Sequence, residues 1–265
     1  MKIGFIGCGN MAGAIINGLI CSGTAKGNEI NIFDINNDAL SALNEKHGCN
    51  ICSDEIEATE KSDILFLAVK PNVIGSVIGK ISKSASENNC LVISIAAGKD
   101  IEFLEGNASN SLKIVRVMPN INAKAGEAIS AYCSNENVTE KEKKTVEALL
   151  QSFGKFIALD EKFFPVFGVI GGCSPAFAYM FIDALARAAV KNGMSKKDAL
   201  IISAQAVYGS AKMILESDKH PFELIDNVCS PGGTTIEGVL SLQEDGFEAA
   251  IHNAVNKAVE KDKRL

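Results

Sequence analysis

A turn near the carboxyl end of the chain has the composition of a binding site for a small anion. Residues 230–236 read Ser-Pro-Gly-Gly-Thr-Thr-Ile. The two glycines allow close approach of the backbone to a ligand, and Thr234 with Glu237 has the spacing of a capping box that opens a helix. A helix start offers free N–H groups and the positive end of the helix dipole, which suits a substrate carboxylate. An ordinary turn into a capped helix has the same pattern, so other parts of the chain must distinguish the two.

A nucleotide-binding pattern lies at the other end of the chain. Residues 2–6 read as a short strand, and the sequence Gly-Cys-Gly-Asn-Met-Ala at 7–12 leads from it into an apolar helix. Gly7 permits a tight turn, Gly9 lets the backbone approach a pyrophosphate, and Ala12 keeps the helix close to the strand. Asp34 ends the next predicted strand, near the spacing of about 20 residues expected for an acidic ribose ligand. The sequence therefore predicts dinucleotide binding.

Alternating strands and helices must position these residues. Up to about residue 160, the pattern predicts strands at 2–6, 29–33, 50–52, 63–69, 90–95, 113–117, 127–132 and 155–159, and helices at 11–21, 38–46, 73–82 and 139–152. Strands that are apolar almost throughout favour a mostly parallel, doubly wound sheet of the Rossmann type. The strand ends near Val69 and Ala96 then fall on the carboxyl edge, where a cofactor crosses such a sheet.

After residue 160 the pattern predicts only helices, at 175–191, 195–217, 221–229, 235–245 and 247–262, with Ser174 as the N-cap of the first. Asp183, Arg187 and Lys191 form one narrow stripe on that first helix, and its other faces are apolar. Such a helix must be buried nearly all round, and a domain of roughly a hundred residues has little interior. We therefore expect two domains, 1–160 and 161–265, and a homodimer or larger homo-oligomer that assembles through the C-terminal helices.

The composition favours a cytoplasmic protein that binds neither nucleic acid nor membrane. The net charge is −6 and the pI about 5.2, which disfavours anionic partners. The first strand follows Met1 directly, with no signal pattern. The most apolar stretch, Phe177 to Val190, is shorter than the ~20 residues that a membrane span needs. The eight cysteines, including the spaced pair Cys49 and Cys52, are expected to be reduced thiols, and no metal site is predicted.

Five segments, taken in order, resemble those of pyrroline-5-carboxylate reductases. They start at Gly7, Ala68, Ser94, Arg116 and Ser230, and read Gly-Cys-Gly-Asn-Met, Ala-Val-Lys-Pro, Ser-Ile-Ala-Ala-Gly, Arg-Val-Met-Pro-Asn and Ser-Pro-Gly-Gly-Thr-Thr. The resemblance covers essentially the whole chain. It implies that NAD(P)H reduces the C=N bond of Δ1-pyrroline-5-carboxylate to give L-proline, the last step of proline biosynthesis. It also implies an N-terminal Rossmann domain, a C-terminal helical dimerisation domain and an active site shared between protomers.

The resemblance also implies roles for particular residues. Thr235 matches the threonine whose hydroxyl hydrogen-bonds the substrate nitrogen, and we expect it to be the catalytic residue. The expected substrate-binding residues are Glu161, Asn227, Ser230, Gly232, Gly233, Thr234 and Thr235. The expected cofactor-binding residues are Ile6, Gly7, Cys8, Gly9, Asn10, Met11, Asp34, Ala68, Val69, Lys70, Pro71, Ala96, Ala97 and Gly98.

Two segments depart from the family pattern. Asn120-Ile121-Asn122 stands where the family has Asn-Thr-Pro, on the cofactor side, and Cys173 occupies a position where the family has another small residue. The cofactor preference also rests on local sequence, because no Lys or Arg follows Asp34 before Lys46. A carboxylate at the end of the second strand accepts hydrogen bonds from ribose hydroxyls and repels a 2′-phosphate. We therefore expect NADH to be used at least as well as NADPH.

Three other classes of protein share parts of this pattern. Tyr208 and Lys212 match the Tyr-x-x-x-Lys of short-chain dehydrogenases, but they fall in the helical region. A β-hydroxyacid dehydrogenase, or another imine reductase, would share the two-domain plan, although no lysine lies one helical turn after the glycines at 171–172. A non-catalytic NAD(P)-binding regulator would be expected to have lost the turn at 230–235.

Overall fold

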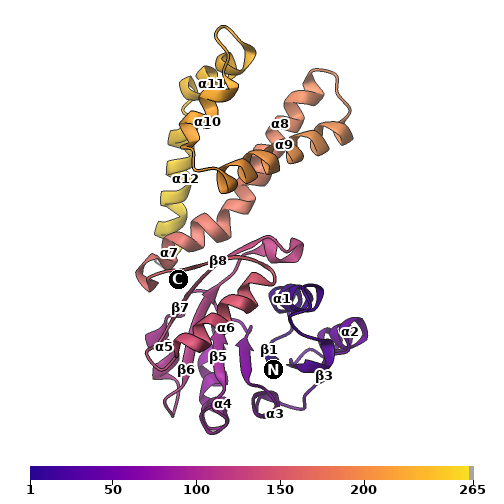
Figure 1. Ribbon diagram of the computed structural model, residues 1–265, viewed down its shortest axis with the longest axis vertical. Helices are drawn as coiled ribbons and strands as arrows, with labels where there is room; N and C mark the ends of the chain where they lie inside the picture. Colours follow the sequence, from indigo (N-terminus) through magenta and orange to yellow (C-terminus); the bar gives the residue numbers. More distant parts are fainter. Residues whose placement is uncertain (263–265) are drawn as a thin grey trace. The chain divides into compact units, whose positions relative to one another are not determined.

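The computed structural model describes residues 1–262 and divides into two compact units, which meet in the sequence between Gly172 and Cys173. We describe each unit by itself (Figure 1). The predicted second domain ends at residue 265, so its last three residues lie outside the described part.

The first unit contains an eight-stranded sheet in the order β3-β2-β1-β4-β5-β6-β7-β8. The strands β1 to β6 are parallel, β7 is antiparallel to β6, and β8 is parallel to β7. Their bounds are β1 (Ile3–Ile6), β2 (Ile30–Phe33), β3 (Asn50–Ile51), β4 (Ile64–Leu67), β5 (Leu91–Ser94), β6 (Lys113–Met118), β7 (Ala128–Ser134) and β8 (Gly154–Ala158). The predicted doubly wound, mostly parallel sheet is confirmed.

Helices cover both faces of this sheet. They are α1 (Asn10–Cys21), α2 (Asn37–His47), α3 (Glu55–Glu60), α4 (Ile74–Glu87), α5 (Ile101–Gly106), α6 (Glu140–Gln151) and α7 (Phe164–Phe167), with 3-10 turns η1 (Gly27–Glu29), η2 (Ile121–Ala125) and η3 (Glu161–Phe163). Successive strand residues point to opposite faces, so Phe5 and Phe66 pack with α1, α2 and α6. Leu65 and Leu67 pack with α3, α4 and α5 on the other face. The core of the first unit is thus two apolar layers on either side of the sheet.

The cysteines are all free thiols, and most of those in the first unit are part of its interior. Cys49 and Cys52 flank β3 and belong to the apolar clusters on opposite faces of the sheet. Burial raises the pKa of Cys49 to about 11 and, together with nearby carboxylates, the pKa of Cys8 and Cys90 to about 12. In contrast, Cys21 and Cys173 are exposed in the chain.

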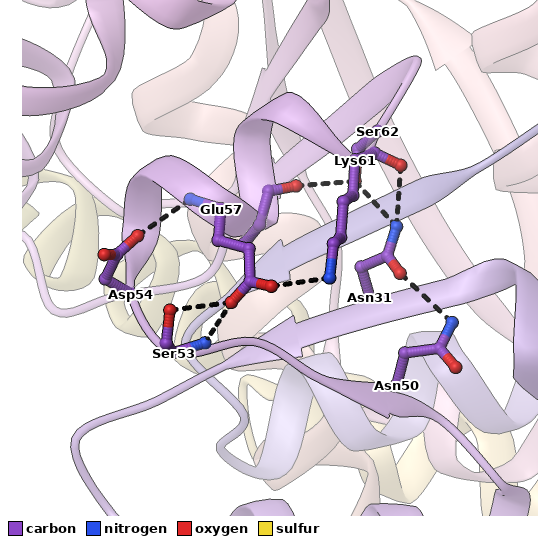
Figure 2. Close-up of polar contacts among 8 residues, drawn as sticks. Asn31, Asn50, Ser53, Asp54, Glu57, Lys61 and Ser62 are labelled. Carbon is purple, nitrogen blue, oxygen red and sulfur yellow. Dashed lines mark hydrogen bonds and ion pairs between the residues drawn. The ribbon is translucent and has the colours of Figure 1, made fainter.

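A polar network ties the short helix α3 to the edge of the sheet (Figure 2). The Glu57 carboxylate accepts hydrogen bonds from the backbone N–H and the hydroxyl of Ser53, and it pairs with Lys61 at 2.5 Å. On β2, the buried Asn31 donates to the backbone carbonyl of Lys61 at 2.8 Å and to Ser62 Oγ. These contacts explain how a six-residue helix without a long apolar face is held in place.

We expect this network to make stability depend on pH in the acid range. The hydrogen bond from Lys61, followed by those from Ser53, lowers the pKa of Glu57 from 4.5 to about 2. A carboxylate whose pKa is lower in the folded state stabilises the protein above its unfolded-state pKa and loses that contribution as pH falls to its folded-state pKa. Thermal unfolding of wild type and Glu57→Gln should therefore differ near neutral pH and converge towards about pH 2.5. Glu60→Gln, an exposed position at the end of the same helix, is the control, and curves that stay parallel throughout would contradict the expectation.

The helix predicted at 175–191 is longer than predicted, and Ser174 is not its N-cap. The elements η3, α7, the π-helical turn η4 (Gly168–Cys173) and α8 (Ser174–Lys191) follow one another directly, so Glu161–Lys191 is one helical run of 31 residues. Ser174 is already helical, and the N-cap residue Cys173 has helical backbone angles (φ −91°, ψ −32°). A π-helical turn interrupts the regular hydrogen-bond pattern, which accommodates Pro175 and its missing N–H.

The length argument against a membrane span is therefore wrong. The run Glu161–Lys191 has a mean hydropathy of 1.5 and is long and apolar enough to cross a membrane by length and composition alone. It is the only such run among residues 1–262. Only 17% of its most apolar part is buried within the chain, so this surface needs another cover.

The second unit consists of helices, as predicted. They are α8, α9 (Lys196–Glu216), α10 (Pro221–Val228), α11 (Thr234–Glu244) and α12 (Phe247–Asp262). Ser195, where the second of these helices was predicted to begin, is the N-cap of α9 and accepts from the Asp198 backbone N–H. The rings of Phe181 on α8 and Phe247 on α12 lie 6.0 Å apart.

The second unit buries little apolar surface of its own. Among its described residues, the buried ones are Pro175, Ala186, Ala199 and Ser203. Large apolar side chains are exposed on all five of its helices instead, including Tyr179, Met180, Leu185, Leu200, Ile201, Met213, Leu215, Phe222, Val228, Leu240, Leu242 and Phe247. An isolated chain with this surface lacks a core in its carboxyl-terminal third.

Candidate active site

The glycine turn connects β1 to α1 at the carboxyl edge of the sheet. Gly7 has φ +94°, and an added Cβ would lie 2.6 Å from the carbonyl oxygen of Ala68, so only glycine fits there. Gly9 is the N-cap of α1 and has nothing within 4 Å of an added Cβ. Ala12 is buried between helix and sheet. The turn thus combines a forced bend with an open face at a helix N-terminus, which fits the pyrophosphate of a dinucleotide.

The Asp34 carboxylate is held beside this turn. Its Oδ2 accepts a hydrogen bond from the Cys8 backbone N–H at 2.6 Å, and its Oδ1 accepts from the Asn36 N–H at 2.8 Å. The Gly7 N–H donates to the carbonyl of Phe33 at 2.8 Å. Asp34 is half-buried and each carboxylate oxygen has a second lone pair, so it can still accept from a ribose hydroxyl.

Two further loops leave the same edge of the sheet. The loop Ala68–Pro71 follows β4, which pairs with β1. The loop Ala96–Gly98 follows β5, which pairs with β4. The order of strands reverses between β1 and β4, which is where ligands bind in open α/β sheets. Ala97 and Gly98 are exposed, and Gly98 has φ +69°. The structure therefore brings the predicted cofactor residues to one edge of the first unit.

Along α1, a cavity of about 540 Å³ borders the glycine turn. Helix α2 forms its other wall, and Lys46 and Lys124 supply positive charge. Sequence reasoning missed Lys124, because η2 begins more than seventy residues after the end of α2 in the chain, and only packing of η2 beside α1 brings Lys124 here.

The turn at 230–235 lies in the second unit, between α10 and α11. Gly232 has φ +68°, a backbone conformation that favours glycine, and a Cβ on Gly233 would lie 2.3 Å from Ser230 Oγ, so that this side chain would have to move. The predicted capping box is wrong, because Gly233 is the N-cap, without a side-chain cap, and Thr234 is already helical. The first-turn N–H groups have no intrahelical acceptors. Thr234 and Thr235 are exposed at this helix start, and Asn227 lies near the end of α10.

Glu161, expected near the substrate, lies in the first unit. It accepts hydrogen bonds from Arg116 and from the backbone N–H of Ile101. Sequence reasoning did not predict this ion pair, since the partners are 45 residues apart. Tyr208 and Lys212 both lie on α9, where Lys212 pairs with Glu216 at 3.6 Å, outside the Rossmann unit that a short-chain dehydrogenase would require.

Comparison with known proteins agrees with this arrangement. Residues 161–265 match the family model for pyrroline-5-carboxylate reductase dimerisation, and residues 2–98 match that for NADP oxidoreductase, coenzyme F420-dependent. The pyrroline-5-carboxylate reductase of Escherichia coli is 42% identical, covering 100% of this chain and 98% of its own. That of Methanosarcina acetivorans is 39% identical, covering 100% and 97%.

Solved structures give the same result. The NADP-bound pyrroline carboxylate reductase of Plasmodium falciparum superposes with a TM-score of 0.88 at 35% identity, covering 100% of this chain and 97% of that one. The enzyme from Coxiella burnetii has a TM-score of 0.93 at 31% identity, covering 99% and 97%. The glycine turn, the carboxyl-edge loops, the Gly-Gly-Thr-Thr helix start and these full-length matches lead to one conclusion: the chain belongs to the pyrroline-5-carboxylate reductase family.

Proposed function

We propose that this protein reduces the C=N bond of Δ1-pyrroline-5-carboxylate with a hydride from NAD(P)H, which yields L-proline. The observation that carries the proposal is the presence, in one chain, of an open glycine turn at β1 and a helix start at α11 that two glycines precede. The relatives named above are pyrroline-5-carboxylate reductases along their full length.

In this proposal, the first unit holds the cofactor. The turn at Gly7–Gly9 approaches the pyrophosphate, Asp34 accepts from the ribose, and the loops after β4 and β5 border the nicotinamide end. The cofactor supplies the hydride when bound. The protein has to orient the two reactants and exclude alternatives, and such positioning contributes up to about 7–11 kcal/mol in favourable cases.

The substrate is proposed to bind at the start of α11. The N–H groups of Thr234 and Thr235, with Asn227 nearby in the sequence, bind the carboxylate at the positive end of the helix. The Thr235 hydroxyl hydrogen-bonds the ring nitrogen and relays a proton from water. An iminium accepts hydride readily, so the absence of a histidine or lysine from the sequence of the turn at 230–235 is consistent with this chemistry.

The dimerisation family covers the second unit, and we propose that it forms a homodimer, or a larger homo-oligomer, in which the helices α8 to α12 cover one another's apolar faces. We place the protein in the cytoplasm.

The enzymatic proposal is tested by following NAD(P)H oxidation with pyrroline-5-carboxylate, beside NAD(P)⁺ reduction with a 3-hydroxyacid. Turnover of the hydroxyacid alone would replace the proposal by a β-hydroxyacid dehydrogenase.

We further propose that NADH is used at least as well as NADPH. The Asp34 carboxylate accepts hydrogen bonds from the backbone amides of Cys8 and Asn36. It could move away from the proposed ribose position only by breaking both bonds. Replacing Asp34 by Ser together with Asn36→Arg should raise the NADPH/NADH ratio of kcat/KM by about tenfold, since it removes a repulsion and adds a phosphate partner.

Asp34→Asn is the matched control for this change in cofactor preference, because it keeps an acceptor for the Cys8 amide while removing the charge. It should shift the ratio in the same direction but less far. Measured kcat/KM for both cofactors decides the matter, and a strong wild-type preference for NADPH would show that Asp34 does not meet the ribose.

A further inference from the structure

The Glu161 carboxylate joins three elements of the first unit. Its Oε1 accepts a hydrogen bond from Arg116 Nη1 on β6 and another from the backbone N–H of Ile101, the first residue of α5, each at 2.9 Å. Burial, followed by the charge of this carboxylate, raises the pKa of the Cys133 thiol on β7 to about 12. One oxygen of the carboxylate therefore has two hydrogen-bond partners within the protein.

The Arg116 side chain makes these contacts costly to disturb. It is only 8% exposed, and its guanidinium lies 4.4 Å from the centre of the Phe164 ring. A buried guanidinium cannot lose its proton and needs an anionic partner, and removing one member of such a pair leaves an uncompensated charge. Glu161 Oε1 is thus held in place by the charge of Arg116.

The Ile101 amide connects this pair to the cofactor edge. Residues 95–100 form the loop that leaves β5, and they include Ala96, Ala97 and Gly98. At the start of the loop, the Ala96 N–H donates to Ser94 Oγ at 3.3 Å. At its end, Asp100 caps α5 by accepting from the Phe103 N–H at 2.8 Å, and the first amide of the helix donates to Glu161 instead. The loop is therefore held at both ends, and Glu161 is the anchor at the carboxyl end.

We propose that Glu161 is a positioning residue for the nicotinamide cofactor, which acts by holding the loop 95–100 through the Ile101 amide and is itself held by Arg116. This inference rests on the proposed function, because the loop borders the cofactor only if the enzyme uses NAD(P)H as proposed. It replaces the direct contact with substrate that the family resemblance implied for Glu161.

The test separates cofactor binding from substrate binding. In Glu161→Gln, the loss of charge breaks the pair with Arg116 and loosens the loop, so the Kd for NADH should rise by about five- to tenfold, measured by the fluorescence of bound NADH. The KM for pyrroline-5-carboxylate at saturating NADH should stay within about twofold. Arg116→Lys keeps a cation for Glu161, and it should weaken NADH binding less than Arg116→Met does.

Glu142→Gln is the matched control. Glu142 pairs at 2.6 Å with Lys113, the first residue of β6, which is the strand that carries Arg116. This variant therefore also breaks an ion pair of β6, and it should leave the Kd for NADH unchanged. If Glu161→Gln does not fold, the Arg116→Lys variant carries the same comparison.

The positioning role would be overturned by an unchanged Kd for NADH in the Glu161 and Arg116 variants, or by a raised KM for the substrate alone, which would mean direct substrate contact. An equal rise of the Kd in Glu142→Gln would also overturn it, since the effect would then be a general loosening of β6. Wild-type protein that binds NADH but does not turn over pyrroline-5-carboxylate would refute the proposed function, while the shift in NADH affinity could still be observed.

Discussion

Replacing Leu185 by glutamate is expected to yield protein that is insoluble or unfolded. Leu185 lies on α8 and is 39% exposed in the single chain, on a helix whose polar residues are confined to the stripe that includes the Asp183–Arg187 ion pair. In the homodimer that we propose, this apolar surface is covered, so the new carboxylate loses its hydration without gaining a partner. Because the second unit has almost no core of its own, failure to assemble also means failure to fold.

Lys191→Glu is the matched control for this variant. It changes charge on the polar stripe of the same helix, near its end, and should leave the protein soluble and assembled. Sedimentation and circular dichroism of both variants measure the outcome. A wild-type protein that remains a stable, active monomer at low concentration would contradict the expectation.

The same argument bears on the apolar run Glu161–Lys191. Its length and hydropathy alone would suit a membrane span, but it begins the segment that matches a dimerisation family. Its α8 portion packs against α9 within the chain. In the homodimer that we propose, a second protomer supplies the remaining cover.

Replacing Thr235 by alanine is expected to lower kcat/KM by roughly 5- to 150-fold, the range that corresponds to losing about 1–3 kcal/mol of transition-state binding from one hydrogen bond. Thr235 is the second residue of α11 and is exposed, so its hydroxyl is free to meet a ligand and its removal costs the fold little. Gly233, not a threonine, caps this helix, which means that the loss cannot be ascribed to a missing helix cap.

Two controls sharpen this test. Thr235→Ser keeps the hydroxyl and should retain most of the activity, whereas Thr235→Val keeps the shape and should behave like alanine. The Kd for NADH should stay near the wild-type value in all three variants. Full activity of Thr235→Ala would show that Thr235 takes no part in catalysis and only forms part of the helix start.

The sequence predicted the sheet well because its strands are buried on both faces. Runs such as Ile64–Leu67 and Leu91–Ser94 are apolar at every position or nearly so, and this pattern has few other interpretations. The short helices α3 and α5 were missed, since six residues are too few to show a helical period. Their N-caps, Asp54 and Asp100, each accept from an amide three residues on, and these were the available signals.

The misplaced helix starts have a different cause. An N-cap residue typically has extended backbone angles, and Gly233 does (φ −82°, ψ 168°), so the motif Thr-x-x-Glu was read one residue too late. At Ser174-Pro175 the pattern of a helix start was present, but the chain is already helical there. Contacts distant in sequence, such as the hydrogen bond from Asn120 Nδ2 to the carbonyl of Gly171 at 2.9 Å, stabilise the π-helical turn and cannot be seen in a local pattern.

The distribution of thiols has a practical consequence for spectroscopy. The buried thiols of Cys8, Cys49 and Cys90, with their raised pKa values, stay protonated at neutral pH and react slowly with alkylating reagents. Cys21 and Cys173 are exposed, one in each compact unit. The natural sequence thus provides an attachment point for a fluorophore or a spin label on either side of the boundary, so that the separation of the two units can be followed as ligands are added.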